Sequence, residues 1–178
     1  MSANPVFVNQ NVAIAHGYAP VPSHDVVLGA ATESDSAICE ALFIEHYQTP
    51  LLLACWNAAQ CRTHLQPQFM MREQQFHDRY PQADHTIIEV NGENIGRLLV
   101  DRQLQVIHII DMILFPAWCG RAIGSHLLDE LCREADKTGK VLALHVACDN
   151  PAQSLYQRFG FKVSEDQGVY RHMERKPT

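Results

Sequence analysis

A continuous stretch of the sequence, residues 104–147, constrains the fold more than any other part of the chain. It starts with the apolar segment LQVIHIIDMILF (104–115), which is typical of a strand in the middle of a sheet. A turn with Gly120 and Gly124 then leads into an amphipathic helix over 122–139, and a second apolar segment, KVLALHVA, follows. Because a helix that joins two neighbouring strands makes a parallel, right-handed crossover, the stretch predicts a mixed sheet of the α/β class.

The flanking segments extend this sheet. Alternation and turn residues predict further strands over residues 25–31, 85–90, 94–100, 161–166 and 169–175. Helical spacing predicts helices over residues 32–49, 56–80 and 150–160. Pro50 is expected to end the first of these helices, and Pro67 is a candidate break in the second. The order predicts one domain over 25–178, with about seven strands flanked by about four helices, after an extended or partly ordered arm over 1–24.

Composition excludes several classes of protein. Apolar residues make up 47% of the 178 residues and charged residues 19%, which is unlike a disordered tail or a coiled coil. The net charge of −6 argues against binding to nucleic-acid phosphates. The longest dense apolar run, residues 50–56, is too short for a membrane span, and no secretory signal pattern opens the sequence. Six cysteines without a CxxC pair predict reduced thiols in a cytoplasmic protein. The net charge and the lack of a long apolar run together predict that the protein has no nucleic-acid or membrane partner.

The histidine content raises the question of a metal site. The ten histidines form no helical i, i+4 pair, no HxH pair and no cluster with cysteine at ligand spacing. His108 and His145 lie on segments that can become neighbouring strands, which leaves an adventitious site open. The sequence therefore predicts no metal cofactor.

The turn after residue 114 has two interpretations. A strand that ends in a glycine turn at the start of a helix points several backbone N–H groups in one direction, and the helix dipole adds positive charge there. Gly120 and Gly124 let a ligand approach the backbone closely, and Arg121 can add a charged contact to a phosphate. The turn either cradles a phosphate group or simply joins two elements.

A second motif favours the phosphate interpretation. The stretch ACDNPAQSLYQRFGF resembles the N-x-A-x-x-L-Y-x-x-x-G-F signature of the GNAT superfamily of acyl-CoA-dependent N-acetyltransferases. The matching residues are Asn150, Ala152, Leu155, Tyr156, Gly160 and Phe161. The turn resembles that family's pyrophosphate motif, Q/R-x-x-G-x-G/A, with Cys119, Ala122 and Gly124 at the three defined positions. The resemblance covers about residues 27–175, and the element order fits throughout.

The resemblance implies both a fold and an activity. It implies a single GNAT-like domain that moves an acetyl group from acetyl-CoA, as co-substrate and without metal, directly to a primary amine. The acceptor is a small molecule, such as a polyamine, an amino sugar or an amino acid, or a peptide N-terminus or lysine. A homodimer is compatible with the family. The alternative on the same fold is a non-catalytic acyl-CoA-binding sensor or partner module, which the altered turn favours.

The family pattern assigns the coenzyme-binding positions. Backbone groups on the strand before the turn are expected to hold the pantetheine arm and the acetyl carbonyl, and amides of the turn to hold the pyrophosphate. These positions are Met112, Ile113, Leu114, Cys119, Gly120, Arg121, Ala122, Ile123, Gly124 and Ser125. Asn150 is expected to contact the coenzyme, to cap the helix after Pro151, or both. Cys119 removes a polar contact of the family, while Ala122 is expected to fit in a helical conformation at no cost.

Three side chains are candidates for catalysis. Tyr156 matches the family's frequent general acid, although a tyrosine that packs on the sheet and bonds a carbonyl gives the same pattern. Asp111, in an otherwise apolar segment, is either the general base or paired with Arg97 or Arg102. His108 is a second candidate base, or else a histidine of the core, and a nearby bulge would decide which face it occupies.

The acceptor site is less defined by the sequence. In the resembled fold the region between the first two helices walls the acceptor site, which makes Glu45, His46, Tyr47 and Trp56 candidate substrate contacts. Simple hydrophobic packing explains these residues equally well. Glu89, on the strand 85–90, is a further candidate because family members often place a carboxylate or a water relay there.

Overall fold

The computed structural model describes Pro22 and residues 25–178, so the arm expected over 1–24 lies outside the described residues apart from Pro22. The described chain forms two compact units. One is the helical unit, Ala31–Pro81. The other, the sheet unit, combines the strand that ends at Ala30 with Gln82–Thr178.

Two long helices make up the helical unit. A short 3₁₀ turn (Glu33–Asp35) precedes α1 (Ser36–Leu53), and α2 spans Ala58–Arg79. Asn57 begins α2 with a capping box, in which its side chain accepts from the Gln60 amide at 2.9 Å while Gln60 bonds back to the Asn57 amide. The two helices pack through Phe43 and Phe69, whose ring centroids are 5.8 Å apart.

The prolines do not interrupt the helices as expected. Pro50 lies inside the last turn of α1, and Pro67 lies within an unbroken α2, so both expected breaks were wrong. A proline removes one backbone hydrogen bond and strains the preceding turn, which packing on either side can offset. For Pro67 that packing comes from Leu65 and Phe69, both buried on the inner face of α2.

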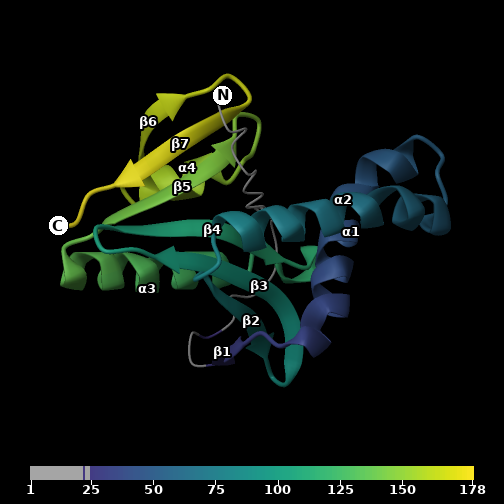
Figure 1. The fold of residues 1–178 in the computed structure, drawn as a ribbon, viewed down its shortest axis with the longest axis horizontal. Helices are drawn as coiled ribbons and strands as arrows, with labels where there is room; N and C mark the ends of the chain where they lie inside the picture. Colours follow the sequence, from purple (N-terminus) through teal and green to yellow (C-terminus); the bar gives the residue numbers. More distant parts are fainter. Residues whose placement is uncertain (1–21, 23–24) are drawn as a thin grey trace. The chain divides into compact units, whose positions relative to one another are not determined.

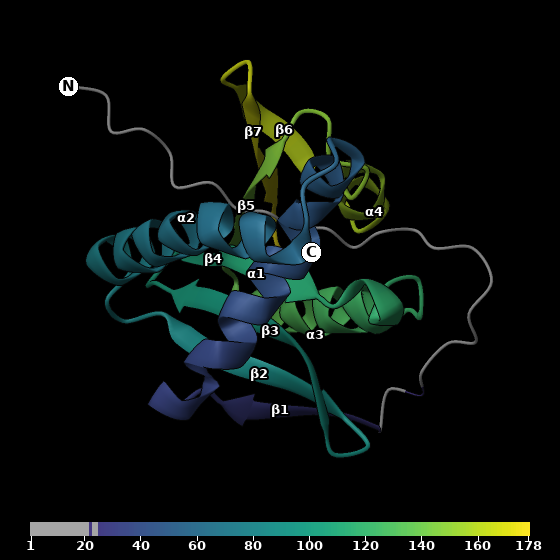
Figure 2. The same cartoon turned by 90° about the vertical axis from the view of Figure 1, so that its right-hand side faces the viewer.

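The sheet unit is a seven-stranded mixed sheet (Figures 1 and 2), as expected from the sequence. Its strands are β1 (Val26–Ala30), β2 (Asp84–Val90), β3 (Glu93–Arg102), β4 (Val106–Leu114), β5 (Val141–Ala147), β6 (Lys162–Asp166) and β7 (Tyr170–Arg175). Their order is β1-β2-β3-β4-β5-β7-β6, and β4 and β5 form the parallel pair while the other neighbours are antiparallel. The helix α3 (Ile123–Thr138) makes the crossover between β4 and β5, and α4 (Gln153–Arg158) follows β5.

The main core lies between the sheet and its two helices. Leu127, Leu128 and Leu131 of α3 and Leu155 of α4 belong to one buried cluster with alternate residues of the central strands. On β4 and β5 those alternate residues are Ile107, Ile109, Met112, Leu114, Leu142, Leu144 and Val146. Burial of each large apolar side chain contributes roughly 1.5–3 kcal/mol, so the cluster fixes which face of each strand meets α3.

An ion pair between Asp136 and Arg175 joins α3 to the end of the chain. Arg175 donates two hydrogen bonds to Asp136, at 2.7 and 2.8 Å, and the backbone N–H of Thr178 donates to the same carboxylate at 2.9 Å.

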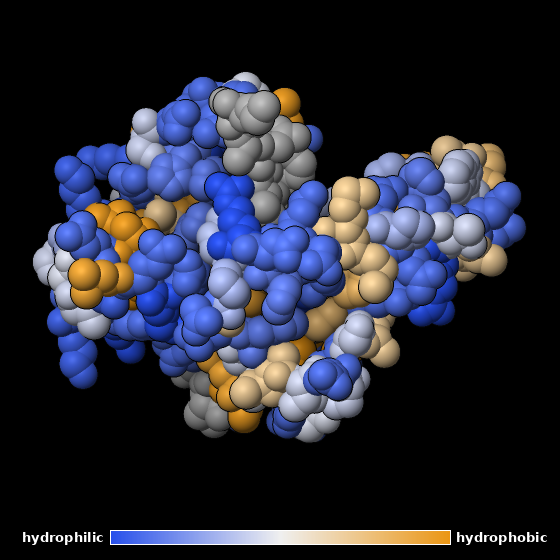
Figure 3. Space-filling model, viewed as in Figure 1, coloured by the Kyte–Doolittle hydropathy of each residue, from blue (hydrophilic) through white to orange (hydrophobic). Residues whose placement is uncertain are grey.

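The surface around the carboxy-terminal strands is mostly hydrophilic on the face seen in Figure 3. Within residues 25–178, no helix combines the length and the apolarity needed to cross a membrane.

The Asp136 contact predicts an acid-dependent stability. The hydrogen bonds from Arg175, and then the Thr178 amide, lower the pKa of Asp136 below its ordinary value. A carboxyl group with a depressed folded-state pKa contributes stability above its unfolded pKa of about 3.9 and loses it as the pH falls. We expect Asp136→Asn to lower the melting temperature at pH 7, with a difference from the parent that shrinks below about pH 4. Asp129→Asn, on the same helix, is the control, and a pH-independent difference at Asp136 would contradict the assignment.

Candidate active site

The central parallel strands separate part of the way along their length. Pairing of β4 with β5 runs from Val106↔Val141 to Ile109↔Leu144 and stops there. Both strands continue, β4 to Leu114 and β5 to Ala147, without pairing to each other. The edge of β4 over Met112–Leu114 therefore turns backbone groups toward an opening between the strands, which we call the splay.

The turn after β4 carries the start of α3. A 3₁₀ turn (Pro116–Trp118) follows Phe115, and Gly120 has a φ of 74°. The first helical bond of α3 runs from the amide of His126 to the carbonyl of Ala122, at 2.9 Å. The amides of residues 123–125 precede that bond, and first-turn amides have no carbonyl partner within their own helix. The turn has the backbone geometry of an anion site.

Ala122 departs from its expected conformation. It is the N-cap of α3 with φ 63° and ψ 2°, which is left-handed, so the expectation of a helical conformation without cost was wrong. A left-handed L-residue is strained by roughly 1–2 kcal/mol, because its Cβ crowds the following carbonyl oxygen. The glycine that the family motif has at this position avoids this strain. Ala122 therefore holds a conformation that suits glycine better than alanine.

This strain predicts that one substitution stabilises the protein. Ala122→Gly removes the crowding but adds glycine's backbone entropy of roughly 0.5–1 kcal/mol, so we expect a net stabilisation of up to about 1 kcal/mol. Urea denaturation of the two proteins measures it. Gly120→Ala is the opposite control and should lower stability, because Gly120 is also left-handed. A destabilised Ala122→Gly protein would contradict the account.

The two side chains expected beside the pyrophosphate have partners within the turn. Cys119 is buried, and its thiol donates to the carbonyl oxygen of Phe115 at 3.5 Å. Arg121 donates from Nε to the Ala117 carbonyl at 3.1 Å, and its guanidinium lies 4.7 Å from the Trp118 ring centroid. Both contacts tie the side chain to the turn itself, so the groups that the turn would offer to an anion are mainly backbone N–H groups.

The segment that leads into α4 is held by side-chain hydrogen bonds to backbone. Asn150 accepts from the amide of Ala152 at 2.8 Å in the turn before α4, whose N-cap is Ala152, and its expected contact with the coenzyme stays a prediction. Gln153 donates to the carbonyls of Ala147 and Cys148, at 2.9 and 2.8 Å. These bonds fix the start of α4 at the end of β5, next to the splay.

Tyr156 has an unusual environment for a phenol. It is completely buried in the core cluster, with its ring 5.8 Å from that of Phe161. Among the described residues its hydroxyl has no hydrogen-bond partner, so the carbonyl bond of the packing interpretation is not formed. Burial, and then the charge of Asp111, raise the pKa of Tyr156 well above its ordinary value of 10. The group is therefore a proton donor at every pH near neutrality.

Asp111 forms an ion pair. Its carboxylate accepts from Nε of Arg97 at 2.8 Å, and the two side chains are 0% and 3% exposed. The pairing expected as the alternative to a base is thus present, with Arg97 rather than with Arg102, which bonds Asp84 and Glu134. The role of Asp111 as a base stays a prediction.

A bulge places His108 and Asp111 on the same face of the sheet. The β3–β4 register shifts between Leu99 and Val100, whose partners are Asp111 and Ile109, so Ile110 is the extra residue. His108 therefore lies on the face opposite α3, with its Nε2 3.2 Å from Nδ1 of His145. The sequence indicated His145 only as a partner of His108 in an adventitious metal site, and not as a residue of the active site. The alternation of residues along β5 could have identified its face, because both neighbours of His145 on this strand belong to the core cluster.

The expected substrate residues fall in both units. Glu45 and Tyr47 lie on α1, where Tyr47 packs on Phe43 at 4.5 Å between ring centroids. Trp56 follows α1 and packs on His64 at 5.2 Å. Glu89 lies on β2 opposite Asn94, with β3 between it and β4. These substrate roles stay predictions.

Within the described chain, no group of three or more His, Cys, Asp or Glu side chains is placed to hold a metal ion.

Among curated proteins, the chain is similar to the cysteine-rich protein 2-binding protein of Mus musculus and of Homo sapiens. Each is 33% identical over 70 residues, which is 39% of this chain. The chain spans only 9% of the length of these relatives.

Solved structures share the fold at low identity. The PaiA N-acetyltransferase from Thermoplasma acidophilum, in complex with coenzyme A, has a TM-score of 0.63 and 17% identity over 85% of this chain and 98% of its own. The ribosomal-protein-S18-alanine N-acetyltransferase from Escherichia coli has a TM-score of 0.58 and 16% identity, over 86% and 94%. A GNAT family acetyltransferase from Elizabethkingia anophelis with acetyl-CoA bound has a TM-score of 0.56 and 14% identity, over 85% and 98%.

A family model describes the same region of the sequence. The acetyltransferase (GNAT) family model matches residues 50–161, which is more than half of the chain. The match includes β4, the turn, α3, β5 and α4, the elements that build the splay and its anion site. The chain belongs to the acetyltransferase (GNAT) family.

Proposed function

We propose that the protein transfers an acetyl group from acetyl-CoA to a primary amine by direct attack, without metal. The observation that carries the proposal is the hydroxyl of Tyr156, buried and without a hydrogen-bond partner among the described residues. A buried unsatisfied polar group costs about 1–3 kcal/mol, so its presence calls for an explanation. A leaving thiolate that accepts its proton supplies that explanation.

The coenzyme part of the proposal rests on backbone geometry. The first-turn amides of α3 would hold the pyrophosphate, and the unpaired edge of β4 at Met112–Leu114 would hold the pantetheine arm and the acetyl carbonyl. A backbone N–H aimed at that carbonyl stabilises the oxyanion as it forms. Relatives of the same fold support this placement, since the Thermoplasma acidophilum structure contains coenzyme A and the Elizabethkingia anophelis structure contains acetyl-CoA.

The proposed reaction balances with groups that the chain supplies. The amine nitrogen attacks the thioester carbon, so a C–N bond forms and the C–S bond breaks. The departing sulfur takes the phenolic proton of Tyr156, and the amine gives one proton to a base. The products are an N-acetylated amine and the free thiol of coenzyme A, and Tyr156 regains its proton from water.

We assign the base to His108. An imidazole takes up a proton readily near neutrality, whereas the carboxylate of Asp111 is held by Arg97. His108 lies on the face opposite α3, and we propose that the amine approaches the splay from this face. We propose Glu89, in the same unit as His108, as a contact of the acceptor, while the substrate roles of Glu45, Tyr47 and Trp56 in the helical unit stay predictions.

Calorimetric titration with acetyl-CoA tests the coenzyme site. Ser125→Glu adds a charge in the first turn of α3, where an acidic side chain suits the helix but repels a phosphate. We expect roughly micromolar binding by the parent, and a loss of at least about 100-fold in Ser125→Glu and in Gly124→Glu. Gly29→Glu is the matched control, because a side chain at this β1 position meets open space. Equal affinities in all four proteins would contradict the site.

A further inference from the structure

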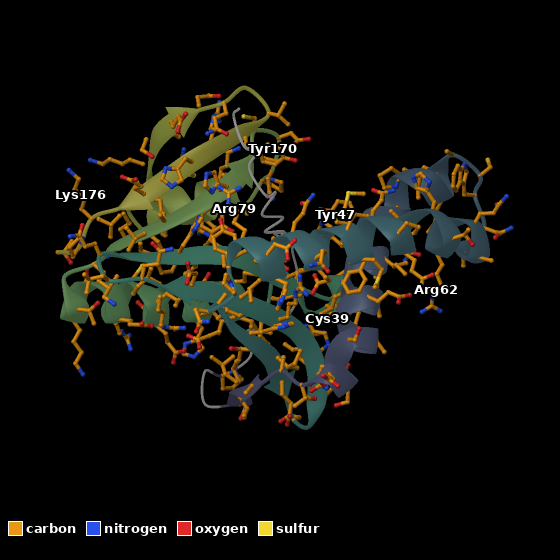
Figure 4. All side chains as sticks on the ribbon, in the orientation of Figure 1. Cys39, Tyr47, Arg62, Arg79, Tyr170 and Lys176 are labelled. Atoms are coloured by element: carbon orange, nitrogen blue, oxygen red, sulfur yellow. The ribbon has the colours of Figure 1, made fainter. Side chains whose placement is uncertain are left out.

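Three histidines from neighbouring strands lie on one face of the sheet unit. His108 on β4, His145 on β5 and His172 on β7 each have a strand neighbour that belongs to the core cluster, so all three face away from α3. His145 and His172 are direct register partners. In Figure 4 the labelled Tyr170 marks the start of β7 and Lys176 lies just past its end, with His172 on the strand between them. We call the three residues the histidine row.

The rings of the histidine row are close neighbours, and one pair of them is within hydrogen-bond distance. Nε2 of His108 is 3.2 Å from Nδ1 of His145, which is hydrogen-bond distance. The ring centroids of His145 and His172 are 4.6 Å apart, and those of His108 and His172 6.4 Å. The row is therefore continuous from β4 to β7, with His145 between the other two.

The two ends of the row differ in their surroundings. At the inner end, His108 lies one residue before Ile109, the last residue of β4 that pairs with β5, and His145 is the first residue of β5 beyond that pairing, so this end of the row lies where the splay begins. At the outer end, Nδ1 of His172 is 2.8 Å from the hydroxyl of Ser164 on β6, the exposed edge strand. The side chain of His172 is 22% exposed. The row therefore leads from the splay to solvent.

Carboxylates of the sheet unit lie near both ends of the row. Asp101 on β3 is the register partner of His108 and is itself buried, with a hydrogen bond from Gln103. Glu174 lies 3.6 Å from Nδ1 of His172. Asp111, further along β4 toward the splay, is paired with Arg97.

We propose that the histidine row carries the proton released by the acceptor amine from the splay to solvent. This inference rests on the proposed function. The amine N–H bond breaks as its nitrogen bonds the acetyl carbon, and His108 takes the proton on one ring nitrogen. His108 then releases the proton on Nε2 to Nδ1 of His145, and His145 passes its other proton through a bridging water molecule to His172 and so to solvent. Each ring returns to its neutral form, and no oxidant or metal takes part.

The relay predicts a defect that a small base repairs. His172→Gln leaves the reacting groups in place, so we expect KM to stay unchanged. We expect kcat near neutral pH to fall roughly 10- to 100-fold, a loss at or below the lower end of what general acid–base catalysis contributes. Added imidazole should restore the rate of this variant and leave the parent unaffected. The deficit should shrink toward alkaline pH, where hydroxide removes the proton. His77→Gln, an exposed histidine of the helical unit, is the control.

A second measurement does not require a known acceptor. Nitrogen-15 NMR of the ring nitrogens follows the three imidazoles through a pH titration of the full chain. A row that shares a proton titrates in coupled steps, and His145→Gln should leave His108 and His172 to titrate independently. Independent titration in the parent would overturn the relay.

The outcomes separate the relay from the function on which it rests. If the parent acetylates an amine but His172→Gln matches it at every pH, with no response to imidazole, the relay is wrong and the proposed function stands. If no amine is acetylated, the proposed function fails. The NMR titration then decides alone whether the row shares a proton.

Discussion

Replacing Tyr156 by Phe is expected to lower kcat by about 100- to 10,000-fold while leaving the affinity for acetyl-CoA unchanged. The phenol is the group placed to protonate the departing thiolate, and burial keeps it protonated by raising its pKa. Phenylalanine keeps the ring and its contact with Phe161, so the coenzyme site should keep its shape. Steady-state rates and a calorimetric titration on the same protein preparation measure the two quantities.

A measurement of the stability of the same variant distinguishes a catalytic tyrosine from a structural one. A structural tyrosine would lose a hydrogen bond on substitution, and the protein would become less stable. Here the hydroxyl has no partner among the described residues, so Tyr156→Phe should unfold at the same or a higher denaturant concentration. A variant that is fully active, or one that is markedly destabilised, would contradict the assigned role.

Breaking the buried pair of Arg97 and Asp111 is expected to have the largest effect on stability. Arg97→Met leaves an uncompensated carboxylate in a site where both side chains are almost fully buried. Removal of one partner from such a pair typically costs about 3–5 kcal/mol. Urea denaturation measures the loss, and Asp111→Asn should also be destabilising because it leaves the guanidinium without its counter-charge.

The double replacement distinguishes a broken pair from a damaged core. Arg97→Met with Asp111→Leu removes both charges and fills the site with apolar groups, so most of the lost stability should return. If the double variant is less stable than either single variant, poor packing rather than an unpaired charge explains the effect. The double variant also tests Asp111 directly, because acetyl transfer that persists without its carboxylate excludes it as the base.

Much of the sheet could be predicted because its signals are local. The apolar segments on both sides of the 123–138 helix and the glycine at its end fix the parallel crossover without reference to the rest of the chain. The end of the helix that contains Pro50 and the continuity of the helix that contains Pro67 could not be predicted in this way. Proline marks a local cost, and in α2 the packing of Leu65 and Phe69 offsets it.

The site depends on features that the sequence does not encode locally. The conformation of Ala122 is imposed by the turn around it rather than by its own preference. The face of His108 depends on the bulge at Ile110, which appears only when β3 and β4 are paired. His172 joins the row because β7 lies beside β5, a neighbour relation between segments that are separated in sequence by α4 and β6. Register and strand order, rather than residue type, bring these groups together.

Release of coenzyme A thiol in the presence of primary amines tests the central claim most directly. The panel comprises polyamines, amino sugars, amino acids, peptides with free N-termini and peptides with a free lysine. The account predicts that at least one class raises thiol release above the rate without amine, and that the amine gains the mass of one acetyl group. Tight binding of acetyl-CoA with no amine-dependent release from any class would contradict catalysis, and would make the protein an acyl-CoA-binding module on the same fold.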